Sequence, residues 1–149
     1  MRAVIQRVSS SNVVVDGKVT GKTDMGLMVL IGVEKGDNDK DAQYIADKVC
    51  NLRIFEDEDD KMNLSVKDIG GSILAVSQFT LLADARKGRR PSFTGAESPQ
   101  LANELYEKCC SKMRDNGMHV EQGIFQTDMS VEIHNEGPVT ILLDSKRLF

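Results

Sequence analysis

The stretch Met25-Gly26-Leu27-Met28-Val29-Leu30-Ile31-Gly32-Val33 decides the fold. It is a near-continuous apolar run, interrupted by Gly26 and Gly32, and it is short enough to form a strand with both faces covered. We therefore predict that it is a central strand of a sheet. The segments on either side must then supply its neighbouring strands and its cover.

The segment before this strand predicts an antiparallel hairpin. Val4 to Val8 and Val13 to Val19 are rich in β-branched residues, and Asp16-Gly17 interrupts the second of these segments. Asp-Gly is a strong hairpin signal because both residues tolerate a positive φ. Two antiparallel strands are thus expected to start the fold.

Two later segments have the spacing of amphipathic helices. The first begins around Asp37-Asn38-Asp39, which offers helix start signals and negative charges that suit a helix N-terminus. Its recurring apolar residues are Ala42, Ile45, Ala46 and Val49. The second begins with Ser98 as N-cap and Pro99 as first helical residue, and it ends at Asn116-Gly117. Its apolar stripe consists of Leu101, Leu105, Cys109 and Met113.

The last third of the chain predicts three strands. They are Val120 to Phe125, Met129 to His134 and Val139 to Leu143, with turns at residues 126–128 and at Gly137-Pro138. The expected order is therefore ββ-(βα)2-βββ, an α/β fold in which a mixed sheet or a pair of sheets carries helices on one side.

Composition limits the class of protein. The 149 residues, of which 40% are hydrophobic, fit one globular domain, 1–149. No stretch approaches the roughly 20 apolar residues of a membrane span, and the N-terminus lacks an apolar signal region. We therefore expect a cytoplasmic protein. The acidic residues 56–60 lack the glycine and the distant glutamate of an EF-hand, so we expect a solvated loop there.

The few cysteines and histidines give no sign of a metal site. Cys50, Cys109 and Cys110 cannot all pair within one chain, and they are expected to be free thiols. His119 and His134 have no zinc-site spacing and no nucleophile beside them, so we expect structural or surface roles. The prediction is a protein without a metal or an organic cofactor.

The net charge of −4 argues against nucleic-acid binding through bulk charge, but a local basic cluster is present. Arg86, Lys87, Arg89 and Arg90 lie within five positions, broken by Gly88 and followed by Pro91. This composition indicates an exposed loop. The loop is either a solubilising turn or a phosphate contact.

Two short segments set special residues against apolar strands. Ile73 to Val76 runs into Ser77-Gln78-Phe79-Thr80, which brings three uncharged hydrogen-bonding side chains together. This segment is either an ordinary strand end or the wall of a site. Gly137-Pro138, between two apolar strands, has by itself the composition of a hairpin turn.

The two segments together resemble the signatures of the D-aminoacyl-tRNA deacylase family, an SQFTL-type stretch and a Gly-Pro-Val/Phe-Thr stretch. The likeness also includes residues 1–8, 26–33 and 52–55 and the segment Lys87-Gly88-Arg89-Arg90-Pro91-Ser92-Phe93, so it extends over essentially the whole chain. The resemblance implies a three-layer α/β/β fold, a homodimer and aminoacylated tRNA as substrate and partner.

The resemblance also implies roles for residues. Ser77, Gln78, Phe79 and Thr80 would form the hydrolytic pocket, and an activated aminoacyl ester suits such uncharged donors because positioning and oxyanion stabilisation suffice. Gly137 and Pro138 would form a cis peptide that enters the partner's pocket and rejects L side chains by clash. Glycyl-tRNA would remain a possible second substrate. Lys87, Arg89 and Arg90 would hold the tRNA.

Two alternative functions stay open at this point. The first is a non-catalytic nucleic-acid-binding module that uses the basic loop 86–90. The second is a small-ester or peptide hydrolase with Thr80 as nucleophile, for which the sequence offers no activating base nearby.

Overall fold

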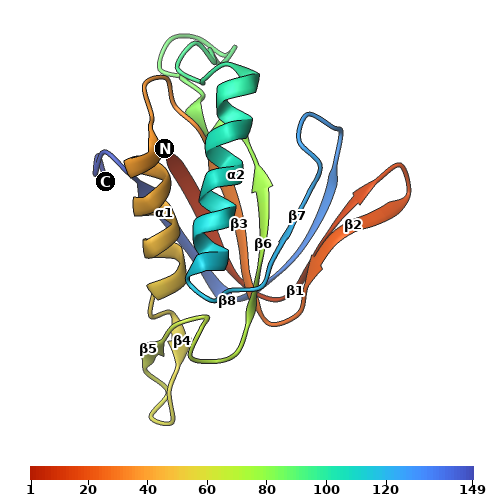
Figure 1. The fold of residues 1–149 in the computed structure, drawn as a ribbon, viewed down its shortest axis with the longest axis vertical. Coiled ribbons are helices and arrows are strands. Elements are labelled where there is room, and N and C mark those ends of the chain that lie inside the picture. Colours follow the sequence, from red (N-terminus) through yellow and green to blue (C-terminus); the bar gives the residue numbers. More distant parts are fainter.

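A computed structural model describes all residues, 1–149, as a mixed α/β fold (Figure 1). The helices are α1 (Asp39–Asn51), α2 (Pro99–Asp115) and the short 3-10 helix η1 (Phe79–Leu82). The strands are β1 (Arg2–Val15), β2 (Lys18–Thr23), β3 (Gly26–Gly32), β4 (Phe55–Glu56), β5 (Met62–Leu64), β6 (Ser72–Ser77), β7 (Val120–Gln122) and β8 (Ser130–Asp144).

The apolar strand β3 lies inside a six-stranded mixed sheet, as predicted. It pairs antiparallel with β1 and parallel with β6, which in turn pairs parallel with β7. Leu27, Val29 and Ile31 face the main core, whereas Met28 belongs to a second core on the opposite face. Both faces of β3 are thus covered, which explains why its sequence does not alternate.

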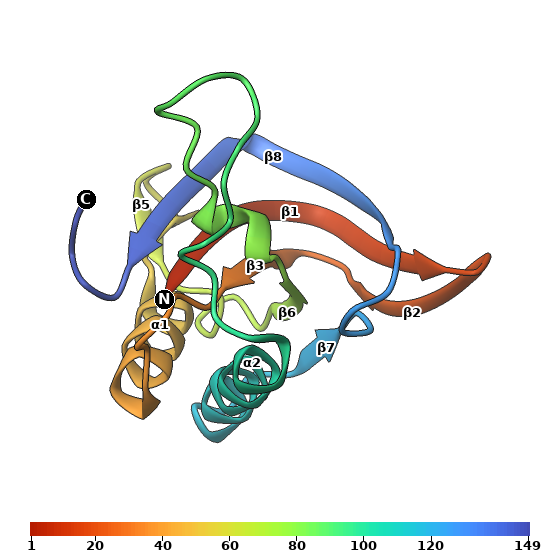
Figure 2. The same cartoon turned by 90° about the horizontal axis from the view of Figure 1, so that it is seen from above.

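The sheet curves until it nearly closes on itself, as Figure 2 shows from above. The closing contact brings β2 against β7 at Gly21, where an added Cβ would lie only 2.4 Å from the backbone oxygen of Gln122. Only glycine permits this approach, because every other residue carries a Cβ. The predicted turn at Asp16-Gly17 joins β1 to β2, and both of its residues have positive φ.

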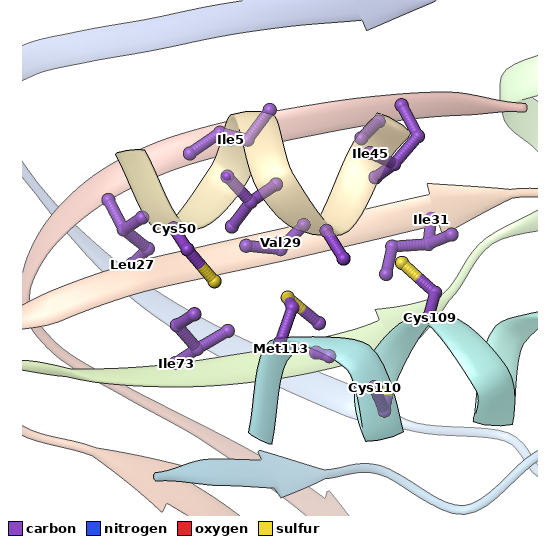
Figure 3. Close-up of a cluster of buried hydrophobic side chains, with 14 of the residues drawn as sticks. Ile5, Leu27, Val29, Ile31, Ile45, Cys50, Ile73, Cys109, Cys110 and Met113 are labelled. Carbon is purple, nitrogen blue, oxygen red and sulfur yellow. The ribbon is translucent and has the colours of Figure 1, made fainter. Parts of the chain in front are cut away.

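Helices α1 and α2 lie side by side on one face of the sheet and cover the larger of the two cores (Figures 1 and 3). Asn38 caps α1 through a capping box with Asp41, and Pro99 begins α2 as predicted. The predicted stripe on α2 was wrong at Leu101, which is exposed, because Ala102 and Tyr106 turn toward the sheet instead. None of the helices has the length and apolar character needed to cross a membrane.

The predicted turn at Gly137-Pro138 and the three final strands were wrong. Residues 130–144 form one strand, β8, which pairs antiparallel with β1 along almost its whole length. Asn135 lies opposite Val8 and Thr140 lies opposite Gln6, so residues 136–139 bulge out where the register shifts. Local composition suggested a hairpin, but both halves of the segment find the same partner strand. The first of the three predicted strands is reduced to β7.

A small two-stranded hairpin, β4–β5, was not predicted as strands. It connects α1 to β6, and Figure 1 places it at the end of the molecule opposite the loop that links η1 to α2. The acidic residues 57–60 lie at its turn and are largely exposed, in agreement with the predicted solvated loop. The observed order is therefore ββ-βα-ββ-βα-ββ, with η1 between β6 and α2.

Candidate active site

The segment Ser77–Thr80 lies where β6 ends and η1 begins. The backbone N–H of Gln78 donates to the Ile31 carbonyl oxygen at 2.8 Å and so continues the pairing with β3. The Gln78 side-chain amide also donates to the hydroxyl of Thr80. The N–H groups of Phe79 and Thr80 are at the start of η1, so they have no acceptor inside the helix. No side chain caps them either. The chain thus presents backbone donors at this point.

Most of these residues border a cavity with a volume of about 530 Å³. Its wall is built by the end of β6, the start of α2 and the loop between β7 and β8. Ser77, Gln78 and Phe79 line it, but Thr80 does not. The other side chains at the wall that matter here are Phe93, Glu97, Phe125, Asp128 and Met129.

Aromatic rings mark the rim of the cavity. Phe79 is 57% exposed, and its ring meets Phe93 edge to face with 5.2 Å between the ring centroids. Such a pair is worth about 0.5–1.5 kcal/mol beyond simple burial. Two aromatic faces at the mouth of a cavity suit a flat ligand such as a nucleobase.

The ionisable groups of the cavity are carboxylates only, Glu97 and Asp128. The backbone N–H of Ser98 donates to Glu97 at 2.7 Å and lowers the pKa of that carboxyl. No histidine, cysteine or lysine lines the cavity. Positioned donors, water and these two carboxylates are therefore the groups available for a reaction here.

The three cysteines are free and buried in the core under the helices, as predicted (Figure 3). Burial raises the pKa of Cys50 to about 11 and that of Cys110 to about 12, and it raises the pKa of Cys109 as well. These thiols are protonated at neutral pH and are not nucleophiles. The structure groups no three His, Cys, Asp or Glu side chains in a way that could hold a metal ion.

The basic loop emerges beside the cavity. Two backbone hydrogen bonds between Asp84 and Ser92 close its base at 2.8 and 2.9 Å, and the chain then continues into Phe93 at the rim. Arg86 forms an ion pair with Asp84 at 2.7 Å and holds the pKa of that carboxyl well below its usual range. The remaining cations, Lys87, Arg89 and Arg90, are exposed.

The Gly137–Pro138 segment does not reach this cavity within the same chain. Both residues are exposed in the bulge of β8, and the peptide between them is cis. Asn135 spans the bulge, because it accepts from the Val139 N–H and donates to the Thr140 hydroxyl, both at 3.1 Å. The structure therefore brings Ser77, Gln78, Phe79 and Thr80 together but leaves Gly137 and Pro138 apart from them.

Sequence analysis missed one residue that holds this bulge, Arg7 on β1. Its side chain is buried, and it donates through Nε to the Glu136 carbonyl oxygen at 3.2 Å. Gly137 leaves the space for it, since an added Cβ would lie 2.8 Å from Nη2 of Arg7. Phe125 and Met129 of the cavity wall were also missed. Their only sequence signal was the predicted turn between them.

The fold is thus a mixed α/β fold, and hydrogen-bonding side chains and two carboxylates line its cavity. The chain belongs to the family described as D-Tyr-tRNA(Tyr) deacylase, whose family model matches residues 4–144. The curated D-aminoacyl-tRNA deacylase of Fervidobacterium nodosum is 57% identical over 149 residues, and the similarity covers 100% of both chains.

Two solved structures are similar to this chain in fold. A protein described as c-Myc DNA Unwinding Element Binding Protein is 37% identical, with a TM-score of 0.91 over 97% of this chain and 98% of that one. A structure described as a probable eukaryotic D-amino acid tRNA deacylase has a TM-score of 0.79 at 18% identity, over 95% of this chain and 97% of the other. The latter likeness shows the shared fold.

Proposed function

We propose that this protein hydrolyses the ester bond of D-aminoacyl-tRNA and releases the free D-amino acid and intact tRNA. Family membership together with full-length identity of 57% to a curated deacylase carries the proposal. Water adds to the ester carbonyl carbon, the bond to the ribose oxygen breaks, and the ribose oxygen takes up the proton. The ester is activated by its neighbouring hydroxyl, so precise positioning supplies much of the acceleration.

The cavity lined by Ser77, Gln78 and Phe79, with Thr80 next to them in the chain, is the proposed place of this reaction. Carbonyl oxygen becomes negatively charged as water adds, and the uncapped N–H groups of Phe79 and Thr80 are suited to stabilise it. Ser77 and Gln78 hold the aminoacyl end, and the rings of Phe79 and Phe93 contact the terminal adenine. Thr80 acts as a positioning residue, since no base stands beside it to activate its hydroxyl.

We further propose that residues 1–149 act as one cytoplasmic domain in a homodimer. Gly137 and Pro138 of one chain enter the cavity of the other and form a wall that an L side chain would strike. Their exposure in a bulge of β8, apart from the cavity of their own chain, supports this arrangement. β8 pairs only with β1, so its other edge is free for a second copy.

The same wall predicts the range of substrates. Glycine has no side chain to strike Gly137 or Pro138, so glycyl-tRNA is expected to be hydrolysed as well. Lys87, Arg89 and Arg90 contact tRNA phosphates close to the rim, because their loop continues directly into Phe93.

The test is the release of labelled amino acid from matched D- and L-aminoacyl-tRNA in the presence of a chelator. Rapid loss of the D ester alone, unaffected by the chelator, is the expected result. Free aminoacyl esters serve as a control and should be poor substrates, because they lack the tRNA contacts. Binding of tRNA without turnover of either ester would contradict the proposal.

Nucleic-acid binding without catalysis is the second candidate function. The name of the 37% identical relative, a DNA unwinding element binding protein, favours it, and so does the exposed basic loop. It predicts affinity for nucleic acid that is indifferent to Thr80→Ala and Gly137→Ala. The hydrolysis assay above therefore separates the two candidates.

A further inference from the structure

Arg7 connects the bulge of β8 to a distant part of the chain. Its Nη1 donates to the Ile54 carbonyl oxygen and to the Glu56 carboxylate, both at 2.8 Å, while its Nε donates to the Glu136 carbonyl oxygen. The residue is only 6% exposed. Desolvating a guanidinium is unfavourable unless its donors are satisfied, so these contacts fix the position of the group.

Glu56 is the one charged partner in this arrangement. It ends β4, far from the cavity, and its side chain is 44% exposed, whereas that of Arg7 is 8% exposed. The hydrogen bond from Arg7 lowers the pKa of Glu56, so the carboxylate is ionised at neutral pH. The guanidinium is planar, and two acceptors hold its Nη1. The directions in which its Nε and Nη2 donate are therefore fixed as well.

That orientation matters because the guanidinium touches the Gly137–Pro138 segment directly. Nε supports the carbonyl of the residue before Gly137, and Nη2 occupies the space in which a Gly137 side chain would lie. Asn135 closes the bulge from within β8, but no other side chain outside β8 donates to residues 136–138. The position of the segment relative to the sheet therefore depends on Arg7.

We propose that Glu56, acting through Arg7, is a positioning residue for the Gly137–Pro138 segment and thereby for the discrimination between D and L substrates. This inference rests on the proposed function. The β4–β5 hairpin then contributes to substrate selection although it lies at the opposite end of the molecule from the basic loop (Figure 1). A purely structural ion pair would instead affect stability alone.

The experiment compares Glu56→Gln with Glu58→Gln. Glu58 is an exposed residue on the same hairpin and makes no ion pair, so its variant controls for the change of charge. Initial rates on matched D- and L-aminoacyl-tRNA and the KM for each are measured, together with the melting temperature. Glu56→Gln should lower the D-to-L ratio of kcat/KM about tenfold, the effect of losing one charge-assisted hydrogen bond. KM for the D substrate should stay unchanged.

Arg7→Lys provides a second variant that keeps the positive charge. A lysine cannot hold Glu56, Ile54 and Glu136 in one plane, so its loss of discrimination should equal or exceed that of Glu56→Gln. An unchanged D-to-L ratio of kcat/KM in Glu56→Gln would overturn the inference, whether or not both rates fall together. If Glu56→Gln leaves the ratio unchanged but Gly137→Ala lowers the discrimination between D and L esters, the inference fails and the proposed function stands. Failure of the unaltered protein to hydrolyse the D ester would reject the proposed function itself.

Discussion

The Ser77–Thr80 segment and the Gly137–Pro138 segment are fixed in opposite ways. The first is held through its backbone, by the bond from Gln78 to Ile31 and by the turn of η1. The second is held mainly by side chains, those of Arg7 and Asn135. The sheet thus fixes the position of Ser77–Thr80, whereas the position of Gly137–Pro138 depends on the side chains of a few particular residues. Substitutions should therefore be more damaging around the second segment.

Gly137→Ala should have the largest effect. Its φ of +121° is unfavourable for alanine, and the added Cβ would lie 2.8 Å from Arg7 and 2.9 Å from Val139. Displacement of the segment by about 1 Å is expected to reduce discrimination between D and L esters about 100-fold. Initial rates on the two esters measure this ratio.

Gly70→Ala is the matched control for Gly137→Ala. Gly70 also has a positive φ, +66°, but open space surrounds its Cβ position, and it lies outside both segments. It should lose some stability and keep its discrimination. Equal loss of discrimination in both variants would show that backbone strain, and not the segment, governs the ratio.

Thr80→Ala should have a smaller effect, about tenfold on kcat, with the D-to-L ratio unchanged. The hydroxyl accepts from Gln78 and does not line the cavity, so its loss removes a support of the donors and leaves the donors themselves. Steady-state kinetics at saturating substrate measure it, with Thr94→Ala in the neighbouring loop as control. A loss of several thousandfold in the variant, together with a covalent acyl intermediate trapped on Thr80 of the unaltered protein, would make Thr80 the nucleophile.

Tyr106→Phe tests how the core supports the first segment. The buried Tyr106 hydroxyl donates to the Ala75 carbonyl oxygen on β6 at 2.9 Å, two residues before Ser77. Its removal should lower the free energy of unfolding by about 1 kcal/mol and leave both catalysis and discrimination nearly intact. Urea unfolding gives the first quantity. A large loss of activity without loss of stability would mean that β6 is less rigid than its pairing implies.

Arg89→Ala should have the smallest effect, a loss of tRNA affinity of about threefold that shrinks as salt rises. The slope of log affinity against log salt should fall by about one. Arg86→Ala is the matched control and should change affinity less, because Arg86 is already paired with Asp84. Equal slopes for the unaltered protein and Arg89→Ala would remove this residue from the tRNA contact.

Local signals in the sequence were sufficient for most elements. The hairpin at Asp16-Gly17, the buried strand β3, both long helices and the exposed basic loop were predicted, since each depends on residues close together in the chain. Ser77, Gln78 and Phe79 line one cavity in the structure. Their chemical roles stay predictions.

Long-range pairing could not be predicted in the same way. Gly137-Pro138 has the composition of a turn, and only the pairing of residues 130–144 with β1 shows that the strand continues. No local pattern predicted that Arg7 on β1 would be buried. Its partners, Ile54, Glu56 and Glu136, lie far away in the sequence. A buried charge with distant partners leaves no periodic signal.

The pairing of β1 with β8 also has a consequence for protein synthesis. β1 leaves the ribosome early, but β8, which pairs with one of its edges, is made after every other strand and helix. Contacts between such distant segments form slowly, because a long loop must close first. A nascent chain therefore completes β6, which ends at Ser77, before the Gly137–Pro138 segment exists. The edge of β1 that will pair with β8 is open to wrong partners during that interval.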